Sequence, residues 1–212
     1  MKKLLLLLLT SNFLIADFPI ECEGFTQITY VDKKEKSDHT ISCHGKVEID
    51  LSNNYLQCLT TTHNPQKQVH FHDDTHDLYS DQLRATYTQE KGHLVLDKLK
   101  IYGHVCLIQK NDPLNELAFE EMQYALADHL DFDYKKELIV LRSKEDSNVL
   151  YYDQVNNYRI AADEVKVTRN LESQKALVKG IGKVRFTFDN AELENFKKHF
   201  FGKSKELENA KL

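Results

Sequence analysis

Strict alternation of apolar and polar residues is the feature that most limits how this chain can fold. In "GKVEIDL", Val47 and Ile49 alternate with charged residues. The same period of two recurs in three further segments: "KLKIYGHVCL" (98–107), "DEVKVTR" (163–169) and "GKVRFTF" (182–188). Alternation with one apolar face is typical of strands that are half buried against a core. No segment between residues 40 and 188 has a comparable helical period, so the pattern predicts an all-β domain.

Two short phrases also recur in turn along the chain. The first is a small residue, Asp, any residue and an apolar residue, and its aspartates are Asp81, Asp128 and Asp163. The second is Gly-x-Val, found at residues 45–47, 103–105 and 182–184, with a glycine-less copy in "SNVLYYD" (147–153). Such alternation indicates stacked β-hairpin units, each of which needs its neighbours to bury its apolar face. The uneven spacing predicts loop insertions, one of them at residues 109–123.

The amino-terminal segment has a different character. Lys2 and Lys3 precede an apolar run that ends at Ala16, with a polar break at residues 10–12. This order is typical of a secretory signal peptide, and the run is too short and interrupted for a permanent membrane span. We predict a signal peptide at residues 1–16 that is cleaved after Ala16. An uncleaved anchor is the alternative.

The carboxyl-terminal segment, residues 189–212, is rich in Glu, Lys and Ala. Leu193, Phe196 and Phe200 lie three to four residues apart, so one face of a short helix would be apolar. We predict a helical tail that folds back over the end of the β-domain, which then spans residues 17–188.

Charge and cysteine content narrow the function further. The chain has 28 basic and 33 acidic side chains, a formal net charge of −5, which argues against a nucleic-acid-binding face. In an oxidising compartment, four cysteines allow two disulfides in three pairings, and buried free thiols are the alternative. These cysteines are Cys22, Cys43, Cys58 and Cys106.

Three ordered copies of the two phrases occupy residues 79–108, 124–153 and 158–188. Behind a signal peptide, this arrangement resembles the OstA/LptA-like proteins of lipopolysaccharide transport, over about residues 40–188. The resemblance implies a β-jellyroll of stacked antiparallel hairpin units, shaped like an open clamshell. The four cysteines and the short carboxyl-terminal helix depart from the family pattern.

The resemblance also implies a function that needs neither catalysis nor a cofactor. It implies a periplasmic carrier that shields the acyl chains of lipopolysaccharide in an apolar groove between inner-membrane and outer-membrane components. Contacts with those components, and head-to-tail self-association, would use edge strands near residues 25–31 and 184–188. The alternating faces supply the groove, although the same residues can fill a closed sandwich core. The candidate lipid-binding residues are Val47, Ile49, Leu99, Ile101, Val105, Leu107, Val165, Val167, Val184, Phe186 and Phe188.

The segment "HFHDDTH" (70–76) favours a different class of protein, a cupin-like metal-dependent enzyme. His70 and His72 would share one strand face, and His76 or Asp77 can add a ligand. The usual cupin frame is rich in glycine, however, and no glycine occurs between Gly45 and Gly92. We therefore expect a strand end followed by a solvated polar turn, with no resident metal and no enzymatic activity. A membrane-anchored relative of the same transport family is the other alternative.

Overall fold

In the computed structural model, residues 19–31, 38–60, 68–90, 93–110, 122–169 and 176–200 are described. They form one large antiparallel sheet, a single 3-10 turn and one helix, which confirms the predicted all-β fold with a short carboxyl-terminal helix. The predicted signal peptide and the last twelve residues of the tail lie outside these ranges. No helix among the described residues has the length and apolar character needed to cross a bilayer.

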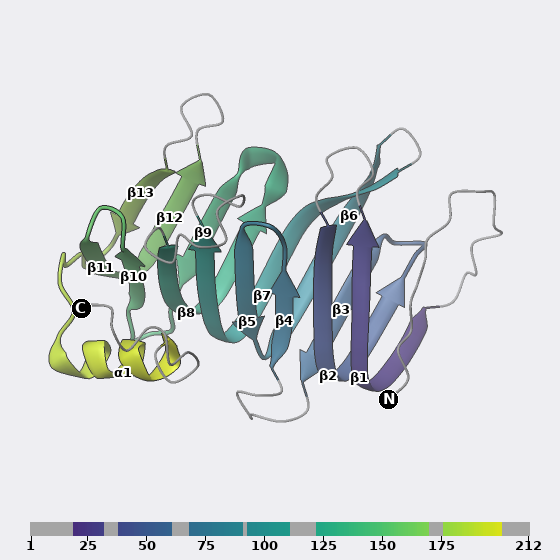
Figure 1. Ribbon diagram of the computed structural model, residues 1–212, viewed down its shortest axis with the longest axis horizontal. Helices are drawn as coiled ribbons and strands as arrows, with labels where there is room; N and C mark the ends of the chain where they lie inside the picture. The colour runs from purple at the N-terminus through teal and green to yellow at the C-terminus, as the bar shows by residue number, and fades with distance from the viewer. Residues whose placement is uncertain are drawn as a thin grey trace.

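The elements follow one another along the chain as in Figure 1. The strands are β1 (Ile20–Val31), β2 (Asp38–Asp50), β3 (Tyr55–Thr60), β4 (Val69–His72), β5 (His76–Ser80), β6 (Gln82–Glu90), β7 (His93–Lys110), β8 (Met122–Asp133), β9 (Leu138–Arg142), β10 (Val149–Asp153), β11 (Tyr158–Ala162), β12 (Glu164–Arg169) and β13 (Ala176–Ile181). The 3-10 turn η2 (Tyr134–Lys136) follows β8, and helix α1 spans Asn190–Phe200.

Long strands fold the sheet back on itself into two facing halves. The β2 strand pairs with β4 through residues 40–42 and with β3 through residues 45–50. In the same way, β7 pairs with β5 through residues 106–109 and with β6 through residues 93–102. The front half in Figure 1 contains β4, β5, β10 and β11, and the rear half contains β3, β6, β9, β12 and β13. This is the β-jellyroll that the family resemblance implied.

The two halves meet at a line of bends, and the recurring aspartates and glycines lie there. Gly103 has a φ of +73°, and His104 Nδ1 lies 2.7 Å from the carboxylate oxygen Oδ2 of Asp81. Gly182 has a φ of +84°, and the backbone N–H of Lys183 donates to Asp163 Oδ2 at 3.0 Å. Glycine adopts such φ values without the steric cost that other residues meet. In each copy, the aspartate of the first phrase therefore supports the bend at the glycine of the second phrase.

The glycine-less copy makes a similar contact with different donors. Asp128 Oδ2 accepts hydrogen bonds from the backbone N–H of Lys144 at 2.9 Å and from the Ser147 hydroxyl at 3.3 Å. The Ser147 hydroxyl thus donates to the aspartate at the position where the other copies have glycine. The repeated phrases in the sequence therefore correspond to one structural feature, an aspartate carboxylate in contact with a chain bend, which occurs three times along the bend line.

The strand predicted at residues 182–188 is wrong. β13 ends at Ile181, and Arg185 makes only an isolated bridge to Ala161 of β11. The chain turns at Gly182, so the alternating residues that follow it do not continue a ladder. The carboxyl-terminal edge of the rear half is therefore β13 rather than residues 184–188. At the other end, within the part of the chain that the structure describes, β1 pairs only with β2 and is an edge strand, as expected.

Helix α1 begins with reciprocal capping between two acidic residues. The backbone N–H of Glu192 donates to Asp189 Oδ1 at 2.9 Å, and the Asp189 N–H donates to Glu192 Oε2 at 2.8 Å. Phe196 and Phe200 are buried and pack against Tyr124 of β8. The helix therefore covers the outer face of the sheet near β8 and β10 (Figure 1), and it does not lie along the β13 edge.

All four cysteines are free thiols in this structure. Cys43, Cys58 and Cys106 are buried and Cys22 is half buried. The apolar interior therefore holds the two halves together without a covalent link among them.

Candidate functional site

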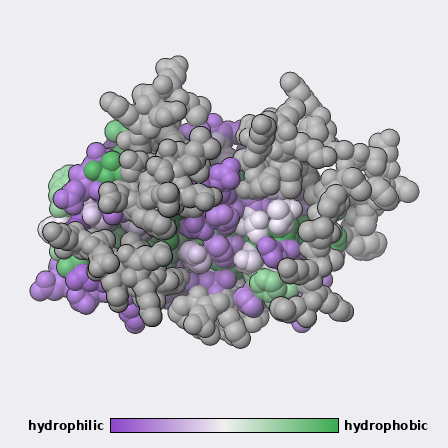
Figure 2. Space-filling view, viewed as in Figure 1, coloured by the Kyte–Doolittle hydropathy of each residue, from purple (hydrophilic) through white to green (hydrophobic). Residues whose placement is uncertain are grey.

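One continuous apolar cluster fills the space between the two halves of the sheet. It contains eight of the predicted lipid-binding residues, which come from β2, β7 and β12. All eight are buried, with Leu99, Ile101 and Val105 fully inaccessible to solvent. The face in view in Figure 2 is mostly hydrophilic wherever described residues are visible, as alternation requires. The eight residues are Val47, Ile49, Leu99, Ile101, Val105, Leu107, Val165 and Val167.

The other three predicted residues lie outside this cluster. Phe188 belongs to a second cluster beneath helix α1, where its ring lies 5.2 Å from that of Phe196. Val184 and Phe186 are 37% and 76% exposed. The prediction placed them inside because their sequence alternates, but residues 182–189 are not a strand, so the alternation does not define an inward face.

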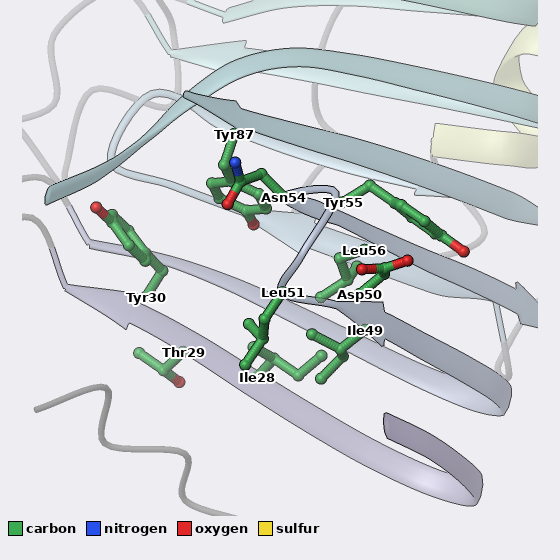
Figure 3. Close-up of a pocket in the computed structure, with 10 residues that line it drawn as sticks. All are labelled: Ile28, Thr29, Tyr30, Ile49, Asp50, Leu51, Asn54, Tyr55, Leu56 and Tyr87. Atoms are coloured by element: carbon green, nitrogen blue, oxygen red, sulfur yellow. The ribbon is translucent and has the colours of Figure 1, made fainter. Parts of the chain in front are cut away.

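The apolar interior opens at the end of the molecule that carries β1. Here Ile28 of β1, Leu51 after β2 and Leu56 of β3 line a space of about 520 Å³ that includes open solvent. The rings of Tyr30 and Tyr87 complete the wall, and Figure 3 draws all the lining side chains. The lining is predominantly hydrocarbon, which suits a ligand with apolar chains. We call this space the amino-terminal pocket.

Sequence reasoning missed the amino-terminal pocket. Tyr87 comes from β6 in the rear half, and Tyr30 comes from the edge strand β1. Their ring centroids lie 5.9 Å apart, although 57 positions of the chain separate the two residues in sequence. Alternation in "FTQITYV" marks Ile28 and Tyr30 as one face of a strand. No local pattern shows which strand they will face.

In the described part of the chain, two polar contacts bridge the open side of the jellyroll, opposite the bend line. The hydroxyl of Tyr134, at the rear rim, donates to Asp73 Oδ2 in the β4–β5 turn of the front half at 2.8 Å. Nearer β1, His39 Nε2 of β2 lies 3.3 Å from the Tyr87 hydroxyl of β6. We call Asp73–Tyr134 and His39–Tyr87 the rim contacts. Burial raises the pKa of both tyrosines well above the usual range, so their hydroxyls stay protonated and can donate.

The β4–β5 turn differs from the solvated turn that the sequence predicted. Asp73 and His76 are both buried and face the interior. Asp73 Oδ1 accepts from the backbone N–H of Thr75 at 2.8 Å and of His76 at 2.6 Å, and the His76 ring nitrogen lies 3.1 Å away. Burial alone would raise the pKa of Asp73, but the hydrogen bond and charge of His76 outweigh it and hold that pKa well below its usual range. The carboxylate is therefore ionised at neutral pH.

His70 and His72 lie on the outer face of the front half, as predicted. Val69 and Phe71, which alternate with them, are buried in the apolar cluster. Asp77 of β5 lies beside both histidines, and the ligand atoms of the three residues lie within 4.8 Å of one another. His76, the third candidate from the sequence, points to the opposite side of the sheet. The histidines are thus separated from the interior by the sheet itself.

The fold and its apolar interior define an LptA-like β-jellyroll. No protein-family model and no curated protein sequence matches the chain. Among solved structures it is similar to LptH, described as the LptA-homologous periplasmic component of the lipopolysaccharide transport device of Pseudomonas aeruginosa. The TM-score is 0.52 at 8% sequence identity, over 71% of this chain and 94% of LptH. At this identity the likeness shows a shared fold, the one that the repeated phrases had indicated.

Proposed function

We propose that this protein is a non-catalytic periplasmic carrier that shields the acyl chains of lipopolysaccharide between the inner and outer membranes. The observation that carries the proposal is the apolar cluster between the two sheet halves, which runs from strand β1 to strand β12 and opens at the amino-terminal pocket. The similarity of the fold to LptH supports it.

An apolar interior is sufficient for this task. Burial of acyl chains contributes roughly 0.8 kcal/mol per methylene, so a continuous apolar wall binds them without any catalytic group. The residues of the cluster are already packed against one another, and Leu99, Ile101 and Val105 have no exposed surface. Acyl chains therefore enter only if the two halves move apart, and this movement would break the rim contacts.

The edge strands β1 and β13 are suited to binding partner proteins. Among the described residues, β1 pairs only with β2 and β13 pairs only with β12. A free edge offers backbone N–H and C=O groups on which another strand can add. We propose that β1 and β13 join the protein to the inner-membrane and outer-membrane components, or to a second copy of itself.

The lipid proposal is tested with a photo-crosslinking amino acid placed at matched neighbours in living cells. Ile28 and Ile101 face the pocket and the interior, whereas Gln27 and Lys100 precede them on the same strands and are exposed. We expect crosslinks to lipopolysaccharide from Ile28 and Ile101 and few from Gln27 and Lys100. Equal capture at the exposed positions would show that lipopolysaccharide does not occupy the interior.

Export and cleavage are tested separately. If the predicted signal peptide, residues 1–16, is removed, the protein isolated from cells begins at Asp17, and Edman sequencing reads Asp-Phe-Pro. A chain that still begins with the lysines and leucines would favour the membrane-anchored alternative.

A further inference from the structure

The outer face of the β4–β5 hairpin carries two histidines and an aspartate that no part of the proposed function uses. We propose that His70, His72 and Asp77 form a binding site for one divalent transition-metal ion, with Zn²⁺ as the expected occupant. The site lies on the opposite side of the sheet from the apolar interior. It does not depend on lipid carriage.

Strand pairing brings the three ligands together. His70 and His72 are two residues apart on β4, so both project to the outer face. In the antiparallel register, His72 is opposite Asp77 of β5. Asp77 Oδ1 lies 2.8 Å from His70 Nε2 and 2.9 Å from His72 Nδ1. The ligand atoms of the three residues thus already lie within 4.8 Å of one another.

The hairpin holds these side chains in place. Val69, Phe71 and Leu78, which alternate with the ligands, are buried in the apolar cluster and fix the strands from the other side. The His70 ring stacks on Tyr79, with centroids 4.3 Å apart and an interplanar angle of 1°. Ligands on packed strands with supported side chains are pre-organised for binding, because little conformational entropy remains to be lost.

The carboxylate of Asp77 can also offer a second oxygen to a cation. In the structure both histidines contact the same carboxylate oxygen, which leaves its partner Oδ2 outside these contacts.

The ligand types select the metal. Two imidazoles and one carboxylate suit Zn²⁺, Cu²⁺ or Ni²⁺ better than Ca²⁺ or Mg²⁺, which prefer oxygen ligands. Bonds of about 2.0–2.2 Å in a tetrahedral site place ligand atoms about 3.3 Å apart. The two carboxylate–imidazole distances of 2.8 and 2.9 Å therefore need to open by about half an ångström to admit the ion, while the two imidazole nitrogens, which lie within 4.8 Å of each other, take up the same spacing. Three protein ligands leave a fourth position for water on the solvent side.

The test uses the tag-free mature protein after removal of bound metal. Zinc chloride is titrated into it in a calorimeter, and the visible spectrum of the Co²⁺ form reports the ligand geometry. We expect one ion per chain. Removing a ligand should weaken binding at least about tenfold, since even the loss of a residue that supports a ligand has effects of that size. The variants are His72→Gln and Asp77→Asn, both at the outer face.

His129→Ala is the matched control. His129 is an outward histidine on β8 whose Nε2 lies 3.2 Å from Asp131 Oδ1, but among the described residues it belongs to no group of three potential ligands. We expect it to bind zinc as the parent protein does. Thermal melting of each variant verifies that it is folded. The proposal is overturned if folded parent protein takes up no zinc, or if His72→Gln and Asp77→Asn bind it as tightly as His129→Ala.

Discussion

Asp73 is the residue on which the front rim depends most. Its carboxylate is buried and accepts hydrogen bonds from two backbone N–H groups of its own turn and from the Tyr134 hydroxyl across the opening. A buried charge is tolerated only when it is paired and hydrogen-bonded. This cluster of donors therefore explains why an aspartate can face an otherwise apolar interior.

Asp73→Asn should destabilise the protein. The neutral amide keeps the shape of the side chain but loses the negative charge beside His76. Its single oxygen can accept from the turn N–H groups or from the Tyr134 hydroxyl, but not from both. We expect a loss of about 1–3 kcal/mol in the free energy of unfolding, measured by urea denaturation. Asp74→Asn, at the exposed neighbouring position, should change it by less than about 0.5 kcal/mol. Equal effects at both positions would mean that the buried contacts contribute nothing.

Asp73 should also make the free energy of unfolding depend on pH. Because the folded-state pKa of Asp73 lies below its ordinary value of 3.8, ionised Asp73 stabilises the fold at any pH above that value. This stabilisation is lost as the pH falls below 3.8 toward the folded-state pKa. We expect part of the acid-induced loss of stability to be missing in Asp73→Asn, as measured by urea titrations at successive pH values. Parallel pH profiles for the two proteins would contradict this assignment.

Among the elements, the bends show how much the sequence can and cannot predict. Alternation and the recurring phrases predicted the strands around Val47, Leu99 and Val165, their buried faces and the stacking of units. They also marked Asp81 and Gly103 as members of the two recurring phrases, without showing that the two residues are in contact. At residues 182–188 the same alternation failed, because Gly182 turns the chain and strand pairing, which is not local, decides where a ladder ends.

Contacts across the opening were beyond prediction for the same reason. Tyr134 is 61 positions from Asp73, and no local pattern links the two. Asp73 and His76 therefore resembled an ordinary polar turn. The sequence found most of the apolar wall, which needs only a period of two, and missed the amino-terminal pocket and the rim contacts, which need the three-dimensional pairing.

Gly103→Ala should cost more stability than Gly24→Ala. Both glycines have positive φ, so both substitutions carry a conformational cost of about 1–2 kcal/mol. A Cβ at Gly103 would also lie 2.5 Å from Asp81 Oδ2, whereas at Gly24 it would meet nothing within 4 Å. Urea unfolding of the two variants measures the difference. If Gly24→Ala proves as damaging, the contact with Asp81 is not what requires glycine at the bend.

Helix α1 should be attached chiefly through Phe196. This side chain is almost completely buried among Tyr152, Phe188 and Phe200. Phe196→Ala is expected to cost about 3–5 kcal/mol in the free energy of unfolding or to release the helix, which circular dichroism and limited proteolysis detect. Phe186→Ala, at an exposed position, should behave as the parent protein. A stable, protease-resistant Phe196→Ala variant would mean that the helix is held by other contacts.

In the whole molecule, the bend line and the opening are built differently. Long strands pass through the bends, so backbone ladders continue from one half to the other. Across the opening, the contacts seen among the described residues are between side chains, and no strand pairing joins the two rims. Under the proposed function, the rims are where acyl chains would enter.

The Tyr134→Phe variant tests whether side-chain contacts across the opening control the entry of acyl chains. It removes the hydroxyl that bonds Asp73 and keeps the ring that stacks on Phe132, with centroids 4.0 Å apart. We expect faster uptake of lipopolysaccharide carrying a fluorescent acyl chain, followed by stopped-flow fluorescence, and a stability loss of about 0.5–1.5 kcal/mol. Tyr102→Phe, at an exposed position on β7, should leave the uptake rate unchanged. Unchanged uptake in Tyr134→Phe would place the point of entry elsewhere.

An opening that is bridged only by side chains, in the described part of the chain, has a topological consequence. A closed barrel admits a long molecule only by threading it through an end, so everything attached to that molecule must fit the bore. Among the described residues no rung of the backbone ladder crosses this opening, so the two halves can part there without breaking one. Under the proposed function, a ligand with a bulky polar portion would therefore be inserted and released sideways, with that portion in water throughout.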